Sequence, residues 1–91
     1  MGYNLKKSVK AYQVGKYGKV PKWVKKAVDE GIISIEEGVI KSRNLNIDVE
    51  NVYLIQGNNI EFVPDGDYIL KLDDYFYPVS SEMFERIIAQ P

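Results

Sequence analysis

Apolar and polar residues alternate most regularly in the second half of the chain. Between positions 52 and 79, four apolar runs are separated by connections of two to four residues rich in Gly, Asn and Asp. Short apolar runs bounded by such turns are typical of β-strands joined by hairpins. Because the connections are so short, the pattern predicts a four-strand antiparallel meander. Its strands are Val52–Gln56, Ile60–Val63, Tyr68–Leu72 and Tyr75–Val79.

The first part of the chain predicts a strand followed by a helix. Ser8–Val14 alternates imperfectly and favours a strand. Pro21 then opens a helix at a position where its missing N–H costs nothing, and Gly31 ends it in the left-handed conformation. One face of this helix is apolar because its apolar residues stand three and four apart. These residues are Val24, Ala27 and Val28.

The middle of the chain predicts two further short strands. Ile32–Ile35 and Val39–Ser42 are apolar runs on either side of a predicted turn, Glu36–Gly38. Arg43–Asn46 is polar and predicts a second turn, whereas the pattern of Ile47–Glu50 is ambiguous.

A closing helix follows the meander. Ser80 or Ser81 is its expected N-cap, and four apolar residues have the spacing of a face that packs on a sheet. These are Met83, Phe84, Ile87 and Ile88. We therefore expect one α+β domain over residues 1–91, with residues 1–7 as a candidate disordered segment. Its small curled antiparallel sheet would be covered by one helix from the N-terminal half and one C-terminal helix.

The composition narrows the cellular setting. The chain has no cysteine, which removes the main sequence support for an oxidising compartment. Met1–Lys10 lacks the apolar run of a signal peptide, and no apolar stretch approaches the roughly 20 residues that span a bilayer. We expect a cytoplasmic protein, in the host cell if a phage encodes it, with no membrane association.

The residue inventory argues against catalysis. Histidine and cysteine, the usual general base and the best nucleophile at neutral pH, are both absent. The paired carboxylates are Glu36-Glu37, Asp65-Asp67 and Asp73-Asp74, and each pair lies in a predicted turn that needs such residues for its backbone shape. The sequence therefore predicts a non-enzymatic protein with no cofactor and no metal site.

Charge is divided unevenly along the chain. The charged residues up to position 28 are eight lysines, whereas all thirteen acids lie beyond it. This asymmetry favours one basic and one acidic surface, or two halves that pack together and neutralise each other. The acidic pI of about 5.4 argues against nonspecific nucleic-acid binding.

The segment Gly15–Lys26 is the candidate anion site. Its glycines let backbone N–H groups approach an anion, its lysines supply compact charge, and its aromatic rings can stack on a base. It does not match a nucleotide-binding P-loop, and a solvated surface loop is the alternative. The candidate ligand-binding residues are Lys16, Tyr17, Lys19, Lys22 and Trp23.

An acidic cluster in the meander is the candidate protein-binding surface. Five acids fall within fourteen residues and can imitate a run of phosphates, although they can equally form the solvated rim of the meander. They are Glu61, Asp65, Asp67, Asp73 and Asp74.

The tail of the sequence resembles a family of small phage and prophage proteins. Pro64–Lys71, Tyr75–Val79 and Met83–Glu85 correspond to that family's C-terminal P-G-D-Y-I, Y-P-C-K-P and D-I-F-E motifs. Val9–Gln13 and Pro21–Val24 are similar to its upstream strand and helix start. The chain departs from the family pattern by an inserted aspartate in the first motif and by valine in place of its cysteine.

The resemblance implies a phage accessory protein and leaves two hypotheses. The first is a counter-defence protein that sequesters an anionic small molecule, such as a nucleotide signal, at the Gly15–Lys26 segment. The second is an inhibitor that occupies a host enzyme with its acidic surface. A homo-oligomer would suit either, because a small sheet has exposed edges that need covering.

Overall fold

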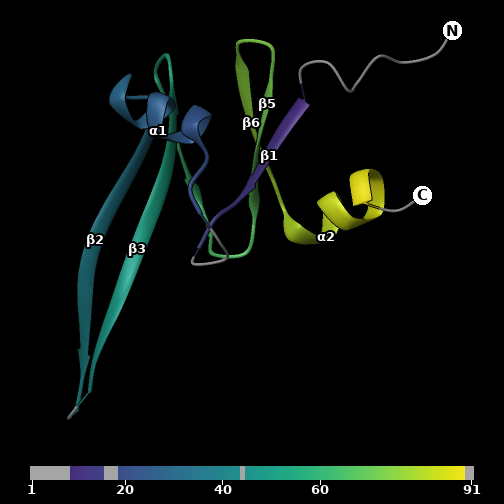
Figure 1. Ribbon diagram of the computed structural model, residues 1–91. Helices are drawn as coiled ribbons and strands as arrows, with labels where there is room; N and C mark the ends of the chain where they lie inside the picture. The colour runs from purple at the N-terminus through teal and green to yellow at the C-terminus, as the bar shows by residue number, and fades with distance from the viewer. Residues whose placement is uncertain (1–8, 16–18, 44, 90–91) are drawn as a thin grey trace, which may run out of the picture.

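The computed structural model describes residues 9–15, 19–43 and 45–89, which form two three-stranded antiparallel sheets and two short helical segments (Figure 1). The architecture is therefore α+β, as the sequence predicts. In the first sheet the order is β1 (Val9–Gln13), β5 (Tyr68–Leu72) and β6 (Tyr75–Val79). In the second sheet the order is β2 (Ile33–Ser42), β3 (Leu45–Gln56) and β4 (Asn59–Val63).

The four strands of the predicted meander all form, but they do not make one sheet. β3 pairs with β4 and β5 pairs with β6, whereas the other neighbour of β5 is β1. The chain just after β1 is also hydrogen-bonded to the turn before β5. Val14 N donates to Asp67 O at 2.7 Å, and Gly66 N donates to Val14 O at 2.8 Å. Short loops are compatible with a meander, but this long-range pairing decides the neighbour of β5.

The predicted turn at Glu36–Gly38 is wrong, because these residues continue β2. Gly38 pairs with Val49, so the ambiguous segment Ile47–Glu50 is part of β3. The chain reverses between Ser42 and Leu45, where Arg43 has a φ of 52°. The β2–β3 hairpin therefore turns within the second predicted turn, Arg43–Asn46. Glu36 and Glu37 can stand in the middle of β2 because their side chains are exposed and the strand backbone pairs with β3.

The predicted helix forms as α1 (Lys22–Asp29) and covers one end of β2 (Figure 1). Pro21 is its N-cap rather than its first helical residue, and Gly31 has a φ of 82° just beyond its end. Val24 and Ala27 are buried, whereas Val28 is 36% exposed. Val24 and Ala27 share one core with Val14, which follows β1, and with residues of both sheets: Ile33, Val52, Leu54, Val63, Ile69 and Phe76.

A glutamine side chain joins the two sheets where no strand pairing connects them. Gln56, at the end of β3, donates from Nε2 to Phe76 O at 2.8 Å. Its Oε1 accepts from Phe76 N at 3.1 Å. One side-chain amide thus satisfies both backbone groups of a residue in β6, as a neighbouring strand would.

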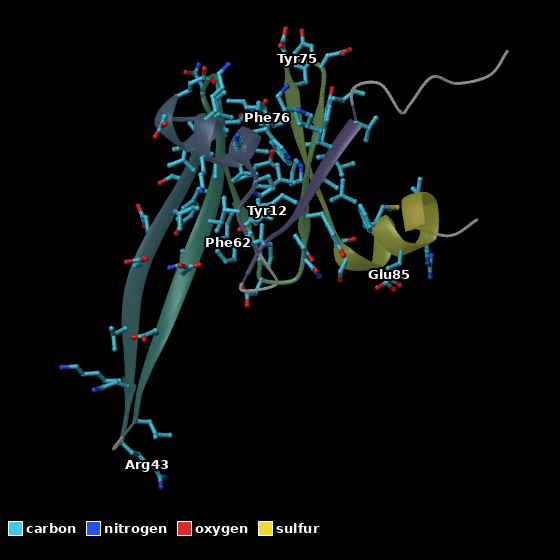
Figure 2. The ribbon with its side chains drawn as sticks, in the orientation of Figure 1. Tyr12, Arg43, Phe62, Tyr75, Phe76 and Glu85 are labelled. Atoms are coloured by element: carbon cyan, nitrogen blue, oxygen red, sulfur yellow. The ribbon has the colours of Figure 1, made fainter. Side chains whose placement is uncertain are left out.

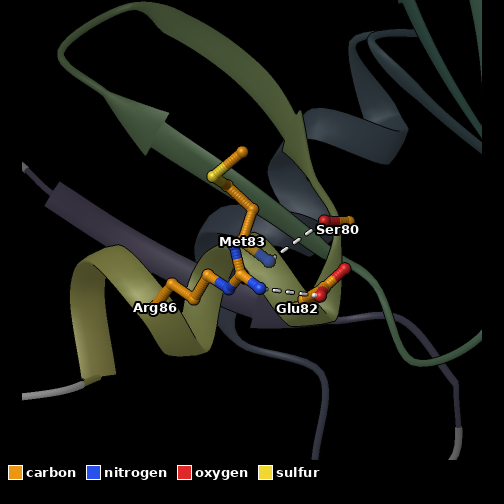
Figure 3. Close-up of polar contacts among 4 residues, drawn as sticks. All are labelled: Ser80, Glu82, Met83 and Arg86. Carbon is orange, nitrogen blue, oxygen red and sulfur yellow. Dashed lines mark hydrogen bonds and ion pairs between the residues drawn. The ribbon is translucent and has the colours of Figure 1, made fainter.

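The closing helix forms, but its apolar face is less buried than the sequence predicts. α2 (Ser81–Phe84) is capped by Ser80, whose Oγ accepts from Met83 N at 3.1 Å, and continues as the π-helical turn η2 (Glu85–Ala89) (Figure 3). Packing of Met83 and Ile87 on a sheet is wrong, because they are 49% and 67% exposed, and the side chain of Ile88 lies outside the described part. Phe84 does pack on the first sheet, because its ring stacks on that of Tyr68 in β5 with the ring centroids 3.8 Å apart.

The second sheet extends far beyond the core as a two-stranded arm. β4 pairs only with residues 52–56 of β3, so residues 36–51 of β2 and β3 form a ribbon of two strands, called the arm below. In Figure 1 the arm extends away from the remaining elements, and Figure 2 shows Arg43 at its tip. The radius of gyration is 14.8 Å, whereas a compact chain of this length is expected at about 12 Å.

Candidate functional site

The structure describes three of the five predicted anion-binding residues. Lys16 and Tyr17 lie outside the described residues. Lys19 and Lys22 are exposed, but Trp23 turns inward, packs against the core and has its ring centroid 6.2 Å from that of Phe76. Trp23 therefore contributes to packing, and α1 presents lysine side chains without an accompanying aromatic ring.

The predicted acidic cluster is divided between the two ends of β5 and a second sheet. Asp65 and Asp67 precede β5, Asp73 and Asp74 follow it, and Glu61 belongs to β4. A five-residue strand spans about 17 Å, so the aspartates before and after it do not face one site.

Two of these aspartates have a structural role in the turns. Asp67 Oδ1 accepts from Ser81 N at 3.1 Å and so anchors the start of α2. Asp73 has a φ of 54° in the β5–β6 hairpin, a conformation that Asp tolerates better than most residues. The backbone geometry of the two turns therefore accounts for Asp67 and Asp73.

A different surface stands out on the second sheet. Tyr53 pairs with Phe62 and Ile55 pairs with Ile60, so four apolar side chains occupy adjacent cross-strand positions. The Tyr53 and Phe62 rings are 5.6 Å apart, and Phe62 and Ile60 are 53% and 68% exposed. We call these four residues the outer patch.

The outer patch lies on the face of the sheet opposite the core. Successive side chains of a strand point to opposite faces, and Val52 and Leu54, the neighbours of Tyr53 in β3, are buried. In β4, Val63 is buried and its neighbour Phe62 is exposed. None of the four outer-patch residues belongs to the core or to the partly buried residues packed against it. This sheet is thus apolar on both faces.

Sequence reasoning missed the outer patch although a signal for it was present. The run Val52–Ile55 is apolar at every position, which is typical of a strand covered on both faces rather than on one. In the predicted meander these residues indicated only a strand, and the prediction assigned no element to cover its second face.

Tyr12 occupies a polar corner near the base of the arm (Figure 2). Its ring is half-buried against the core. Burial raises the pKa of its hydroxyl, and the negative charges of Glu50 and Asp65 raise the pKa further. The Tyr12 hydroxyl therefore keeps its proton and does not serve as a base at neutral pH.

Within residues 9–15, 19–43 and 45–89, no group of three or more acidic side chains is arranged to hold a metal ion. None of the helices in these ranges is long and apolar enough to cross a membrane. No family model matches the chain, and neither a curated protein nor a solved structure matches it. The resemblance to small phage proteins stays a prediction.

Proposed function

We propose that the chain is a non-enzymatic protein-binding module that holds a partner protein on the outer patch. The observation that carries the proposal is the pair of exposed apolar residues, Ile60 and Phe62, beside Tyr53 and Ile55 on a face that no other element of the described part of the chain covers. Contiguous exposed apolar surface on a small protein marks an interaction site. Aromatic residues are also enriched in the buried centres of interfaces.

One charge beside the outer patch indicates the chemistry of the partner. Glu36 is exposed and pairs with Asn51, two residues along β3 from Tyr53 and therefore on the same face. Glu61 pairs with Leu54 and points to the opposite face, so it does not border the patch. A partner with an apolar centre and a lysine or arginine side chain opposite Glu36 would complement this surface. The resemblance to phage proteins makes a host protein the expected partner.

Capture from host lysate with matched variants tests this proposal. A partner held by the outer patch should be captured by the natural chain and lost with Phe62→Asp. Tyr75→Asp is the control, because Tyr75 is 65% exposed at the far turn of the β5–β6 hairpin (Figure 2). A partner that binds both variants equally, or that is lost equally with both, contradicts the proposal.

The exposed lysines of α1 and of the segment before it favour a second candidate, the binding of an anionic ligand. Lys19, Lys22, Lys25 and Lys26 are exposed, the first turn of α1 has no acid, and no side chain caps it. A nucleotide bound there should raise the melting temperature by mass action. The combined variant Lys22→Glu and Lys25→Glu should abolish that increase, whereas no increase with the natural chain at millimolar nucleotide rules this candidate out.

A further inference from the structure

β2 is an edge strand whose outer half has no neighbour on one side. The order of the second sheet is β2-β3-β4, and within the described residues no strand pairs with the free edge of β2. We propose that two copies of this chain pair antiparallel along these edges, so that two arms form one dimer with a continuous six-stranded sheet. This dimer goes beyond the protein-binding function above, because it uses an edge rather than the outer patch.

The hydrogen-bond register shows which backbone groups face the free edge. Ile55 N donates to Ile32 O at 2.7 Å, and the pairing from there to the tip of the arm is continuous. Hydrogen-bonded pairs recur at every second residue of an antiparallel ladder, so the even-numbered residues of β2 bond to β3. The N–H and C=O groups of Glu37, Val39 and Lys41 therefore point away from β3, toward the free edge.

The charges along β2 complement those of a second, antiparallel β2. Glu36 and Glu37 lie in one half of the arm, and Lys41 lies in the other half with Arg43 just beyond. A two-fold axis at Val39 pairs outward-facing groups with outward-facing groups. It also places Glu37 opposite Lys41 of the second copy, and symmetry repeats this ion pair once. Parallel pairing in register would place like charges side by side instead.

The other free edges do not offer this complementarity. The free part of β3 carries the acids Asp48 and Glu50 without a base, and β4 carries only Glu61. β1 carries Lys10 without an acid, and β6 contains Pro78, which has no N–H to donate. Among the described edges, β2 alone combines both signs of charge in separate halves.

The dimer would also give the arm additional neighbouring strands, which stabilise a two-stranded ribbon. A two-stranded ribbon is marginally stable in water, and a third or fourth strand is needed for independent stability. Pairing along β2 would make the arm four-stranded and would occupy the free β2 edge of both copies, so assembly through β2 would stop at two. Because edge pairing buries less than the roughly 800 Å² per partner of a standard interface, we expect a micromolar dissociation constant.

Charge exchange at two positions tests the dimer. Sedimentation velocity of the full chain over about 1 µM to 1 mM should show a shift from one to two chains. Glu37→Lys alone and Lys41→Glu alone should each weaken dimerisation at least tenfold, because each places like charges opposite one another. A mixture of the two single variants should dimerise, since both ion pairs are restored between unlike chains, and the double variant should dimerise by itself.

A backbone variant tests the edge hydrogen bonds separately. Val39→Pro removes an N–H that faces the free edge and leaves every β2–β3 hydrogen bond in place, so it should give a monomer with an unchanged circular dichroism spectrum. Val39→Thr keeps the N–H and should dimerise.

A monomer at all concentrations, or dimerisation that survives both Lys41→Glu and Val39→Pro, overturns the inference. Loss of the lysate partner with Phe62→Asp reports on the protein-binding proposal and leaves this one unaffected.

Discussion

The two faces of the β2–β3–β4 sheet have similar residues and opposite surroundings. On the inner face Leu54 and Val63 are buried, with exposures of 1% each. On the outer face Ile60 and Phe62 are equally apolar but 68% and 53% exposed. The strands have the same alternation on both faces, so the difference comes from α1 and the first sheet, which are packed against the inner face, whereas none of the described elements covers the outer face. We therefore propose the outer face as a surface for contact with another molecule.

The largest expected effect is on the inner face. Leu54→Ala should lower the free energy of unfolding by about 2–5 kcal/mol, because it removes buried methyl groups and leaves a cavity. Ile60→Ala, the matched change on the outer face, should stay within about 0.5 kcal/mol of the natural chain. Urea unfolding followed by circular dichroism measures both. Equal losses would mean that the two faces are equally buried in solution.

The next effect concerns the contact that holds the inner face against the first sheet. Gln56→Ala should cost about 1–3 kcal/mol, because it leaves Phe76 N and Phe76 O without partners in a partly buried place. Gln13→Ala, which removes a single bond to Gly66 O, is the control and should cost less. A smaller loss for Gln56→Ala than for Gln13→Ala in the same urea experiment would show that Gln56 does not join the sheets.

On the outer face, a substitution should abolish partner binding while changing the free energy of unfolding very little. Phe62→Ser removes a ring pair with Tyr53 and should cost about 1 kcal/mol or less. The same variant should lose the partner protein, which a binding titration would measure once that protein is identified. A loss of several kcal/mol in unfolding would show that Phe62 belongs to the core, in conflict with its exposure.

The smallest effect is a dependence on alkaline pH. The pKa of Tyr12 is raised above its ordinary value of 10.0 in the folded chain, so the unfolded chain loses this proton first. The stabilisation is therefore complete below about pH 10 and is lost as pH rises from there through the folded pKa. Tyr12→Phe should make this decline shallower in urea unfolding at pH 9 to 11.

Tyr75→Phe is the control, because it shows the effect of removing an exposed tyrosine hydroxyl. An unchanged slope in Tyr12→Phe would mean that burial and the charges of Glu50 and Asp65 do not raise the pKa of Tyr12 as the structure indicates.

The sequence alone determined the elements whose cause is local. Turn residues such as Gly57 and Gly66 and short apolar runs predicted β4, β5 and β6, and Pro21 with Gly31 bounded α1. Ser80 was one of two expected caps, with Ser81 as the other, because a hydroxyl can accept from the backbone two or three residues later, and the structure has Ser80. These features depend on interactions between residues that are close along the chain, so they can be read from it.

Tertiary structure decided which strands became neighbours and which face was covered. β1 pairs with β5, from which it is separated by more than fifty residues, and this divides the predicted meander between two sheets. Glu36–Gly38 became part of a strand only because residues 49–51 lie opposite. The aspartates of one short segment were placed at opposite ends of β5, and the outer patch is exposed because nothing in the described ranges packs on it. Which strands pair, and which face of a sheet is covered, depends on contacts between residues distant in sequence. The alternation of apolar and polar residues along a strand is the same whichever partner it pairs with, so it cannot identify that partner.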